Sequence, residues 1–225
     1  MADGGGRRRR EDPSVRLSKK LSYVLRHGAT AVGLSMGPDG FAEVGALLAL
    51  PLFAGVSEDD VRRVVGGDPK GRFTLRPHPL RIRANQGHSL PVPLLELRAL
   101  SPPALPPTLA HGTRRRRWPQ IRREGLSVMG RNHIHLAGGV PGDPPLCSGI
   151  RADSEIVIFI DGPAAIAAGI PFFLSANGVI LSPGDSNATI PPRFFRSVLQ
   201  LRPHRCELPL GGPQEGGGDD PPEPQ

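Results

Sequence analysis

Apolar residues near the start of the chain recur at intervals of three and four, which is the spacing of one face of an α-helix. This apolar face consists of Leu17, Leu21, Val24 and Leu25. Gly28 follows, and glycine commonly ends a helix. The pattern therefore predicts a helix over about residues 15–28 and places Arg26 and His27 in its last turn.

Two short helices and two short strands are predicted after this helix. The apolar segment 44–50 favours a helix, and Ser57 can cap another, because acidic residues occupy positions 58–60 of its first turn. The segments 72–76 and 81–86 have the pattern of strands joined by a proline-containing turn. Three helices followed by a hairpin are typical of the winged-helix fold, a common nucleic-acid-binding module.

The second half of the chain is richer in strand patterns. Segments 133–137, 155–161 and 177–181 are β-rich and are separated by Gly/Pro turns. Segment 118–126 has helical spacing, with its apolar residues, Trp118 among them, facing inward. We predict a lobe with a mostly antiparallel sheet here, so that the whole chain belongs to the α+β class.

Gly and Pro make up a quarter of the chain and are concentrated in three places. The ends, residues 1–14 and 207–225, hold too few apolar residues to bury a core and are predicted to be disordered, the first basic and the second rich in Gly, Pro and acidic residues. The proline-rich residues 101–107 are predicted to form a stiff linker. An N-terminal lobe at 15–100 and a C-terminal lobe at 108–206 remain.

The composition excludes several classes of protein. No stretch approaches the roughly 20 apolar residues that cross a bilayer, and the N-terminus lacks the apolar core of a secretory signal, so we expect an intracellular protein of the cytoplasm or nucleus. The two cysteines, Cys147 and Cys206, are too few for a disulfide scaffold or a cysteine-built zinc site, and no metal site is predicted. The net charge of +7 and the pI of about 10.6 indicate a polyanionic partner such as a nucleic acid.

Three groups of polar residues stand out from this background. Arg26 and His27 form the first, segment 82–89 (IRANQGHS) the second, and two histidine-bearing segments, 111–113 and 133–136, the third. A basic pair at a helix C-terminus has an ordinary electrostatic explanation, and a single histidine most often belongs to the core. Segment 82–89, in contrast, gathers five polar side chains around one glycine, which suits neither a core strand nor a solvent-facing one. Two histidines at successive strands favour a ligand pocket.

Together these motifs resemble the NAD-dependent tRNA 2′-phosphotransferases. The resemblance rests on Arg26-His27, IRANQGHS at 82–89, HGT at 111–113, HIHLA at 133–137 and SANGVIL at 175–181, which occur in the family's order between about residues 16 and 204. It implies a winged-helix N-terminal lobe and an ADP-ribosyltransferase-like C-terminal lobe that share one cleft. It further implies that NAD+ is consumed as a co-substrate and that the partner is a 2′-phosphorylated RNA, namely ligated tRNA.

The reaction that the resemblance implies removes the splice-junction 2′-phosphate of ligated tRNA in two steps. The RNA 2′-phosphate first attacks C1″ of the nicotinamide ribose of NAD+ and displaces nicotinamide. The ribose 2″-OH then attacks the bridging phosphate of this ADP-ribosylated RNA. The products are 2′-OH RNA, nicotinamide and ADP-ribose 1″,2″-cyclic phosphate, and we expect the enzyme to work as a monomer.

The family's catalytic residues carry over to Arg26, His27, Arg83 and Arg151. Arginine stays protonated and offers a planar fork that fits two phosphate oxygens. The three arginines are therefore expected to hold the 2′-phosphate and to stabilise the second transition state. His27 is either a further phosphate ligand or a general acid/base, since an imidazole serves in both roles.

The resemblance also implies the residues that bind NAD+. His111, Gly112 and Thr113 match the start of the first strand of the C-terminal lobe, and Gly112 would let the dinucleotide approach the backbone. His135 and Val179 match the second and third positions of the ADP-ribosyltransferase pattern. The third position is a glutamate in relatives that modify protein side chains, but a phosphate nucleophile needs no such base. The residues expected to line the same pocket are Ser175, Asn177 and Gly178.

Two other functions stay open. ADP-ribosylation of terminal phosphates on RNA or DNA would stop after the first step, and a non-catalytic winged-helix protein that binds nucleic acid would not turn over NAD+. The arginine run 114–117 either extends an RNA-binding patch, with Trp118 available to stack on a base, or is a solvated helix start with Trp118 in the core. The run 7–10 is an RNA-binding arm, a nuclear signal or neither.

Overall fold

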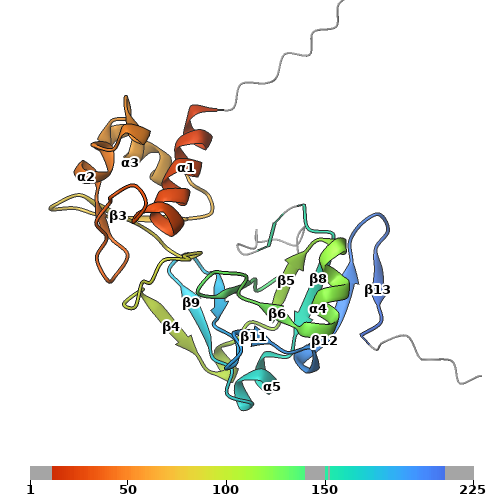
Figure 1. The fold of residues 1–225 in the computed structure, drawn as a ribbon. Helices are drawn as coiled ribbons and strands as arrows, with labels where there is room; N and C mark the ends of the chain where they lie inside the picture. Colours follow the sequence, from red (N-terminus) through yellow and green to blue (C-terminus); the bar gives the residue numbers. More distant parts are fainter. Residues whose placement is uncertain (1–11, 140–149, 152, 211–225) are drawn as a thin grey trace, which may run out of the picture.

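The N-terminal part of the chain forms a helical body with one small sheet (Figure 1). The structure, a computed structural model, describes residues 12–139, 150–151 and 153–210. The elements of this part are α1 (Pro13–Tyr23), a π-helical turn (Val24–Gly28), β1 (Ala42–Glu43), α2 (Val44–Leu48), a 3₁₀ turn (Pro51–Phe53), α3 (Glu58–Gly66), β2 (Phe73–Arg76) and β3 (Arg81–Ala84). The three helices and the β2–β3 hairpin lie in the predicted segments, and these predictions are confirmed.

Local sequence explains where the helices of this part begin. The Asp12 side chain accepts a hydrogen bond from the Ser14 N–H at 2.7 Å, and Pro13 stands in the first turn, where its missing N–H has no cost. Ser57 and Asp60 form a capping box at the start of α3. The helices bury an apolar cluster against an antiparallel sheet with the strand order β1-β3-β2. The largest fully buried residues of this core are Leu21, Leu25, Leu47, Phe53 and Ile82.

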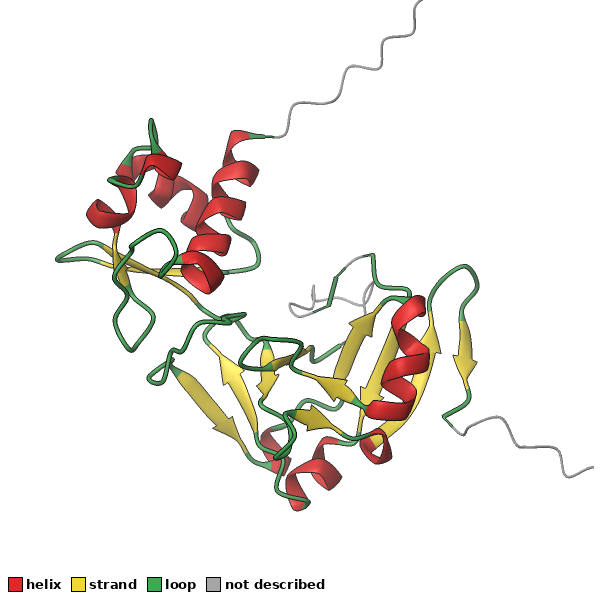
Figure 2. Cartoon of the chain, viewed as in Figure 1, coloured by secondary structure: helices red, strands yellow, loops and turns green. Residues whose placement is uncertain are grey.

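The C-terminal part is built mainly from antiparallel strands, with short helices packed against them (Figure 2). Its elements are β4 (Leu97–Leu100), β5 (Ala110–Thr113), α4 (Trp118–Glu124), β6 (Leu126–Ser127), β7 (Ile134–Leu136), β8 (Ile156–Ile160), α5 (Gly162–Ala167), β9 (Phe172–Ser175), β10 (Ile180–Ser182), β11 (Thr189–Ile190), β12 (Phe195–Gln200) and β13 (Cys206–Leu208). The described strands form three sheets with the orders β4-β9-β10-β7, β13-β12-β8-β5 and β11-β6, and all their pairs are antiparallel. The predicted α+β class is confirmed.

A second apolar core joins these sheets. It takes Ile156, Ile158 and Ile160 from β8 and Phe172 from β9, so that both four-stranded sheets contribute to it. Trp118 packs into the same core from α4. None of the helices in the described part of the chain combines the length and the apolar character needed to cross a bilayer.

The observed boundaries differ from the predicted ones in three places. Residues 97–100, assigned to the N-terminal lobe, form β4 and pair with β9 of the second part. Segment 101–107 is not an extended spacer, because it contains a 3₁₀ turn and because Leu105 packs against the second core. The terminal segments are shorter than predicted, since α1 already begins at Pro13 and residues 207 and 208 pair with β12. Residues 1–11, which include the arginine run near the N-terminus, and residues 211–225 lie outside the described residues.

Hydrogen bonds join the two parts at three places. They run from Asn132 N to His88 O (2.9 Å), from Asn132 Nδ2 to Leu90 O (2.8 Å), from His135 Nε2 to Gln86 Oε1 (2.7 Å) and from Asn177 Nδ2 to Lys70 O (2.9 Å). Segment 86–90, which follows β3, therefore contacts the segment that leads into β7. This junction brings together motifs that are far apart in the sequence.

The buried face of α1 is predicted to stabilise the N-terminal part. Leu21→Ala removes a fully buried side chain and should lower the free energy of unfolding by about 2–5 kcal/mol. Val15→Ala, on the exposed side of the same helix, is the control and should change the free energy of unfolding by no more than about 0.5 kcal/mol. Urea unfolding followed by circular dichroism measures both, and equal effects of the two changes would contradict the described helix orientation.

Candidate functional site

α1 ends in a π-helical turn that carries Arg26 and His27. Val24, Leu25 and Gly28 of this turn are buried in the N-terminal core. The side chains of Arg26 and His27 are half-buried and lie away from that core. A π-helical turn is rare and often occurs at a functional site. Here it directs two consecutive basic residues toward the junction with the C-terminal part.

The guanidinium group of Arg26 lies over Gly87. A Cβ atom at residue 87 would stand 3.3 Å from Cδ and Nε of Arg26, and the φ angle of +91° there is one that glycine adopts without strain. Nε and Nη2 of Arg26 are buried and have no hydrogen-bond partner among the described residues. Burial and the charges of Arg131 and Arg72 lower the pKa of Arg26 to about 10, and Asp68 partly offsets this effect. Arg26 is thus a half-buried cation with two buried nitrogen donors that the described residues leave unused.

Segment 85–89 holds the π-helical turn in place. The Ser89 N–H donates to the carbonyl oxygen of Arg26 at 2.9 Å, and Ser89 Oγ lies 2.9 Å from Nδ1 of His27. The Asn85 side chain accepts from the Thr74 hydroxyl at 2.6 Å, so its role here is structural. Burial, followed by the charges of nearby arginines, lowers the pKa of His27.

Two histidines of the C-terminal part are linked and are kept neutral. Nδ1 of His111 donates to the carbonyl oxygen of His135 at 2.9 Å, because a carbonyl oxygen only accepts, and Nε2 of the neutral His111 ring is left as an acceptor. Nε2 of His135 donates to Oε1 of Gln86 at 2.7 Å. Burial lowers the pKa of His111. Burial and the charges of Arg131 and Arg26 lower the pKa of His135 to about 3.

A cavity of about 470 Å³ opens beside these histidines, with His111 and His135 in its wall. The cationic residues that line it are Arg114, Arg117, Arg131 and Arg151. The apolar residues that line it include Ile121, Val128, Met129 and Ile134. Guanidinium groups beside an apolar surface fit an organic diphosphate that carries flat rings. The lining therefore fits the dinucleotide that the sequence analysis expects.

Arg131 connects this cavity with Arg26. It lines the cavity, and its charge lowers the pKa of both Arg26 and His135. The charge of Arg151 in turn lowers the pKa of Arg131. Among the described residues, Asp68 is the one carboxylate whose charge raises the pKa of Arg26 and so offsets part of this repulsion. The cluster of Arg26, Arg131 and Arg151 thus holds an excess of positive charge that a polyanionic ligand would neutralise.

Sequence reasoning missed Arg131. It lies in the loop before the HIHLA motif, where an arginine needs no special explanation. Its position, with His133 and His135 at alternate residues after it, is the signal that could have identified it.

Five of the predicted site residues line the cavity, namely His111, Gly112, Thr113, His135 and Arg151. Gly112 is required by the chain's own packing, because a Cβ atom there would stand 2.5 Å from Ile150 Cγ2 and 2.6 Å from Ser154 Oγ. The explanation that Gly112 makes room for a ligand is therefore not needed.

Arg83 does not line the cavity. Its side chain is 2% exposed, its Nη2 donates to Glu96 Oε2 at 2.7 Å, and its guanidinium carbon lies 4.8 Å from the centre of the Phe41 ring. Its Nε has no partner among the described residues. Its charge helps to lower the pKa of His88. Arg83 is therefore buried outside the cavity, and its charge acts on His88 of segment 85–89.

Residues 175–179 form the turn between β9 and β10 and do not line the cavity. Ser175 Oγ lies 2.9 Å from both Asn177 Oδ1 and the Val179 carbonyl oxygen, and it accepts from the Val179 N–H. Gly178 supplies the positive φ of this turn, and Val179 is fully buried. The Asn177 side chain donates to Lys70 across the junction. The polar groups of this segment are used to form the turn and to hold the two parts together.

The arginine run 114–117 divides between the cavity and the surface. Arg114 forms an ion pair with Asp153, and both line the cavity. Among the described residues, Asp153 thus forms its ion pair with Arg114 and not with the nearby Arg151. Trp118 is 8% exposed and packs against Phe195, so it is a core residue and is not available for stacking.

Sequence comparisons identify relatives of this chain. The sequence model of the family described as "RNA 2′-phosphotransferase, Tpt1 / KptA family" matches residues 12–184. The chain is 56% identical over 214 residues to tRNA 2′-phosphotransferase 1 of Homo sapiens, which covers 93% of this chain and 85% of the relative. It is 47% identical over 213 residues to tRNA 2′-phosphotransferase 1 of Danio rerio, which covers 92% and 95%. It is 39% identical over 167 residues to a probable RNA 2′-phosphotransferase of Rhizobium leguminosarum, which covers 74% and 87%.

The buried histidine of segment 85–89 is predicted to make stability depend on pH. His88 is 2% exposed, and burial and the charges of Arg26, His27, His133 and Arg83 lower its pKa to about 4. Below about pH 6.5 the unfolded chain binds a proton at this residue that the folded chain does not, so folding should weaken as the pH falls from about 6.5 toward 4.

The expected contribution of His88 is a loss of about 2 kcal/mol of unfolding free energy between about pH 7 and about pH 5. His88→Leu keeps the bulk and removes the proton, and should flatten this part of the profile. Urea unfolding at several pH values measures it. An unchanged slope in the variant would show that His88 is protonated in the folded protein.

Proposed function

The chain belongs to the RNA 2′-phosphotransferase, Tpt1 / KptA family, and we propose that it transfers the splice-junction 2′-phosphate of ligated tRNA to NAD+. It is a transferase, and its activity is that of an RNA 2′-phosphotransferase. The observation that carries the proposal is the cluster of Arg26, Arg131 and Arg151, since a 2′-phosphate next to RNA phosphodiesters is a dense anion.

NAD+ is proposed to bind in the 470 Å³ cavity. Bound there, it supplies an electrophilic ribose carbon whose leaving group is nicotinamide, and a ribose hydroxyl for the second step. Nε2 of His111 is an acceptor suited to a ribose hydroxyl, and Arg114, Arg117 and Arg131 are suited to the diphosphate. The neutral state of His135, enforced by burial and by arginine charges, leaves the positive charge of the site to the guanidinium groups.

The arginine cluster is proposed to hold the 2′-phosphate between the two parts. Arg26 reaches it from the N-terminal part, and Arg131 and Arg151 reach it from the C-terminal part. Fixed guanidinium groups stabilise charge that builds on phosphoryl oxygens without reorganising. His27, whose pKa is lowered, is proposed as a neutral hydrogen-bonding group or proton carrier at this phosphate. Arg83 is proposed as a positioning residue that acts through segment 85–89.

The fold of each of the two lobes is part of the same proposal. The order of three helices and a three-stranded sheet supports a winged-helix N-terminal lobe, and the position of His111 in β5 supports an ADP-ribosyltransferase-like C-terminal lobe. The lobes would meet just before β4, and RNA would lie across the junction.

The proposed reaction predicts a specific set of products. Incubation with NAD+ and an RNA that carries one internal 2′-phosphate should yield RNA lighter by one phosphate, nicotinamide and ADP-ribose cyclic phosphate, as measured by mass spectrometry. RNA heavier by one ADP-ribose would instead indicate a transferase that stops after the first step. Unchanged RNA and NAD+ would contradict the proposal.

Substitutions in the arginine cluster and in the NAD+ cavity should impair different steps of the reaction. Arg26→Ala or Arg151→Ala should slow release of the 2′-phosphate roughly 100-fold to 1000-fold, because each removes a charge from the phosphoryl oxygens, and ADP-ribosylated RNA should accumulate. His111→Ala should block the formation of ADP-ribosylated RNA. Quantifying this RNA in single-turnover reactions separates the cases, with Arg116→Ala, an exposed residue outside the cavity, as the control. Loss of both steps in the arginine variants would contradict this division.

A further inference from the structure

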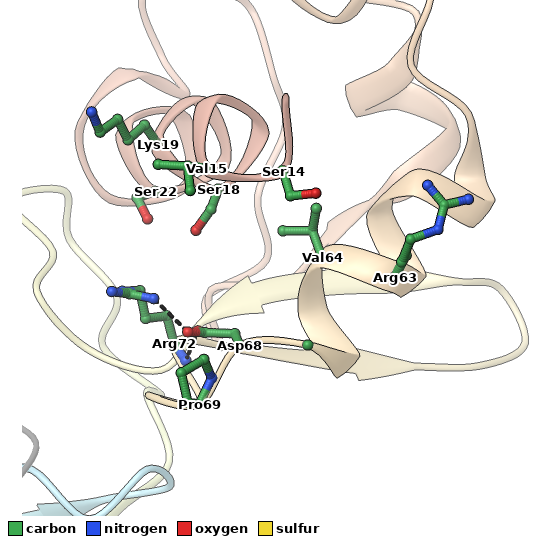
Figure 3. Close-up of a pocket in the computed structure, with 11 residues that line it drawn as sticks. Ser14, Val15, Ser18, Lys19, Ser22, Arg63, Val64, Asp68, Pro69 and Arg72 are labelled. Carbon is green, nitrogen blue, oxygen red and sulfur yellow. Dashed lines mark hydrogen bonds and ion pairs between the residues drawn. The ribbon is translucent and has the colours of Figure 1, made fainter. Parts of the chain in front are cut away.

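A second pocket of about 560 Å³ lies on the N-terminal part, between α1 and the turn that leads from α3 to β2 (Figure 3). It is distinct from the cavity beside His111. Its polar lining consists of Ser14, Ser18, Ser22, Lys19, Arg63 and Arg72, together with Asp68. Figure 3 shows the hydroxyl groups of Ser18 and Ser22 facing Arg72 and Asp68 across the pocket.

The serine side of this pocket leads to the proposed active site. Ser14, Ser18 and Ser22 are four residues apart and share one face of α1. The next residue in the same series is Arg26, about one helical turn beyond Ser22. On the opposite wall, Arg72 is close enough to Arg26 for its charge to lower the pKa of Arg26. The pocket is therefore a groove beside Arg26, the residue proposed to hold the 2′-phosphate.

The lining of the groove carries a net positive charge, because its three cations outnumber its single carboxylate, although Arg63 also pairs with Asp60 outside the pocket. Asp68 has a side chain that is 3% exposed, forms an ion pair with Arg72 and accepts the N–H groups of Lys70 and Arg72. Lys19 and Arg63 extend from opposite rims (Figure 3). The serine hydroxyls add donors that carry no charge. Hydroxyl, ammonium and guanidinium groups are the side chains that bind phosphodiester oxygens of nucleic acids.

We propose that this groove binds the phosphodiester backbone of the RNA substrate next to the nucleotide that carries the 2′-phosphate. The inference rests on the proposed function, because that function places an RNA phosphate at Arg26. An RNA chain with its 2′-phosphate at Arg26 would continue along the serine face of α1, where Val15, Val64 and Pro69 offer apolar surface for its sugars. The groove would add affinity without reading base sequence.

Substitution at Ser18 tests the groove with a size-matched pair. Ser18→Glu places a negative charge in the groove, whereas Ser18→Gln adds the same length without the charge. With a 2′-phosphorylated dinucleotide and a longer 2′-phosphorylated RNA as substrates, Ser18→Glu should raise KM for the longer RNA by roughly fivefold to tenfold more than for the dinucleotide. Ser18→Gln should keep this ratio near the wild-type value.

Salt dependence gives a second readout of the same contacts. Lys19→Gln should lower the slope of log affinity against log salt concentration by roughly 0.7 for the longer RNA, the amount expected for one lost contact to a single-stranded phosphate. Arg62→Gln is the matched control, because Arg62 lies on α3 outside the groove and pairs with Glu58. It should leave the slope unchanged.

The outcomes separate this inference from the proposed function. Equal effects of Ser18→Glu on both substrates, or no difference between Ser18→Glu and Ser18→Gln, would overturn the groove as an RNA site. Failure of the wild-type protein to remove the 2′-phosphate with NAD+ would overturn the proposed function. In that case, fluorescence anisotropy of the longer RNA without NAD+ still tests whether the groove binds RNA. Weaker binding by Ser18→Glu than by Ser18→Gln would support the groove as an RNA site, and equal binding would overturn it.

Discussion

Repulsion between guanidinium groups is the constraint on which the site depends. Arg26 comes from the π-helical turn after α1, and Arg131 and Arg151 come from loops of the C-terminal part, yet the charge of Arg131 lowers the pKa of Arg26 and the charge of Arg151 lowers the pKa of Arg131. Like charges stay together only where the surrounding chain holds them. Here the frame consists of the Gln86–His135 bond, the two bonds of Asn132 and the contact between Asn177 and Lys70. An anion that enters the site would reverse the sign of this interaction and turn an unfavourable arrangement into a stabilising one.

The positive charge of these arginines also explains why the nearby histidines are neutral. His27, His88 and His135 lie near arginines and are at least partly buried, so the pKa of each is lowered. Neutral imidazoles leave the role of charge stabilisation to arginine and keep His27 available for hydrogen bonding or proton transfer. A phosphate bound at Arg26 would counter part of the effect on His27. The histidines and the arginines of the site therefore form one electrostatic unit, and the role of either depends on the other.

The sequence predicted the local elements because their signals are local. The capping box at Ser57, the apolar face of α1 and the alternation in β2 and β3 need no information from elsewhere in the chain. The π-helical turn and the pairing of β4 with β9 depend on tertiary contacts, and no nearby residue indicates them. The motifs identified five residues that line the cavity, but they carried no distances, so buried Arg83 and the 175–179 turn were grouped with it. Arg131 was missed because its alternation with His133 and His135 was not used, and it is the fold that places this loop arginine in a charged cluster.

The pairing of β4 with β9 has a consequence for how the chain can be divided. Although the two cores are separate, the strand that leaves the first core forms the outer edge of a sheet in the second. A fragment that begins after this strand would leave the backbone N–H and C=O groups along one side of β9 unpaired. Such an open edge promotes self-association between molecules. The C-terminal half is therefore not an autonomous module, and its solubility depends on a strand that sequence composition assigns to its neighbour.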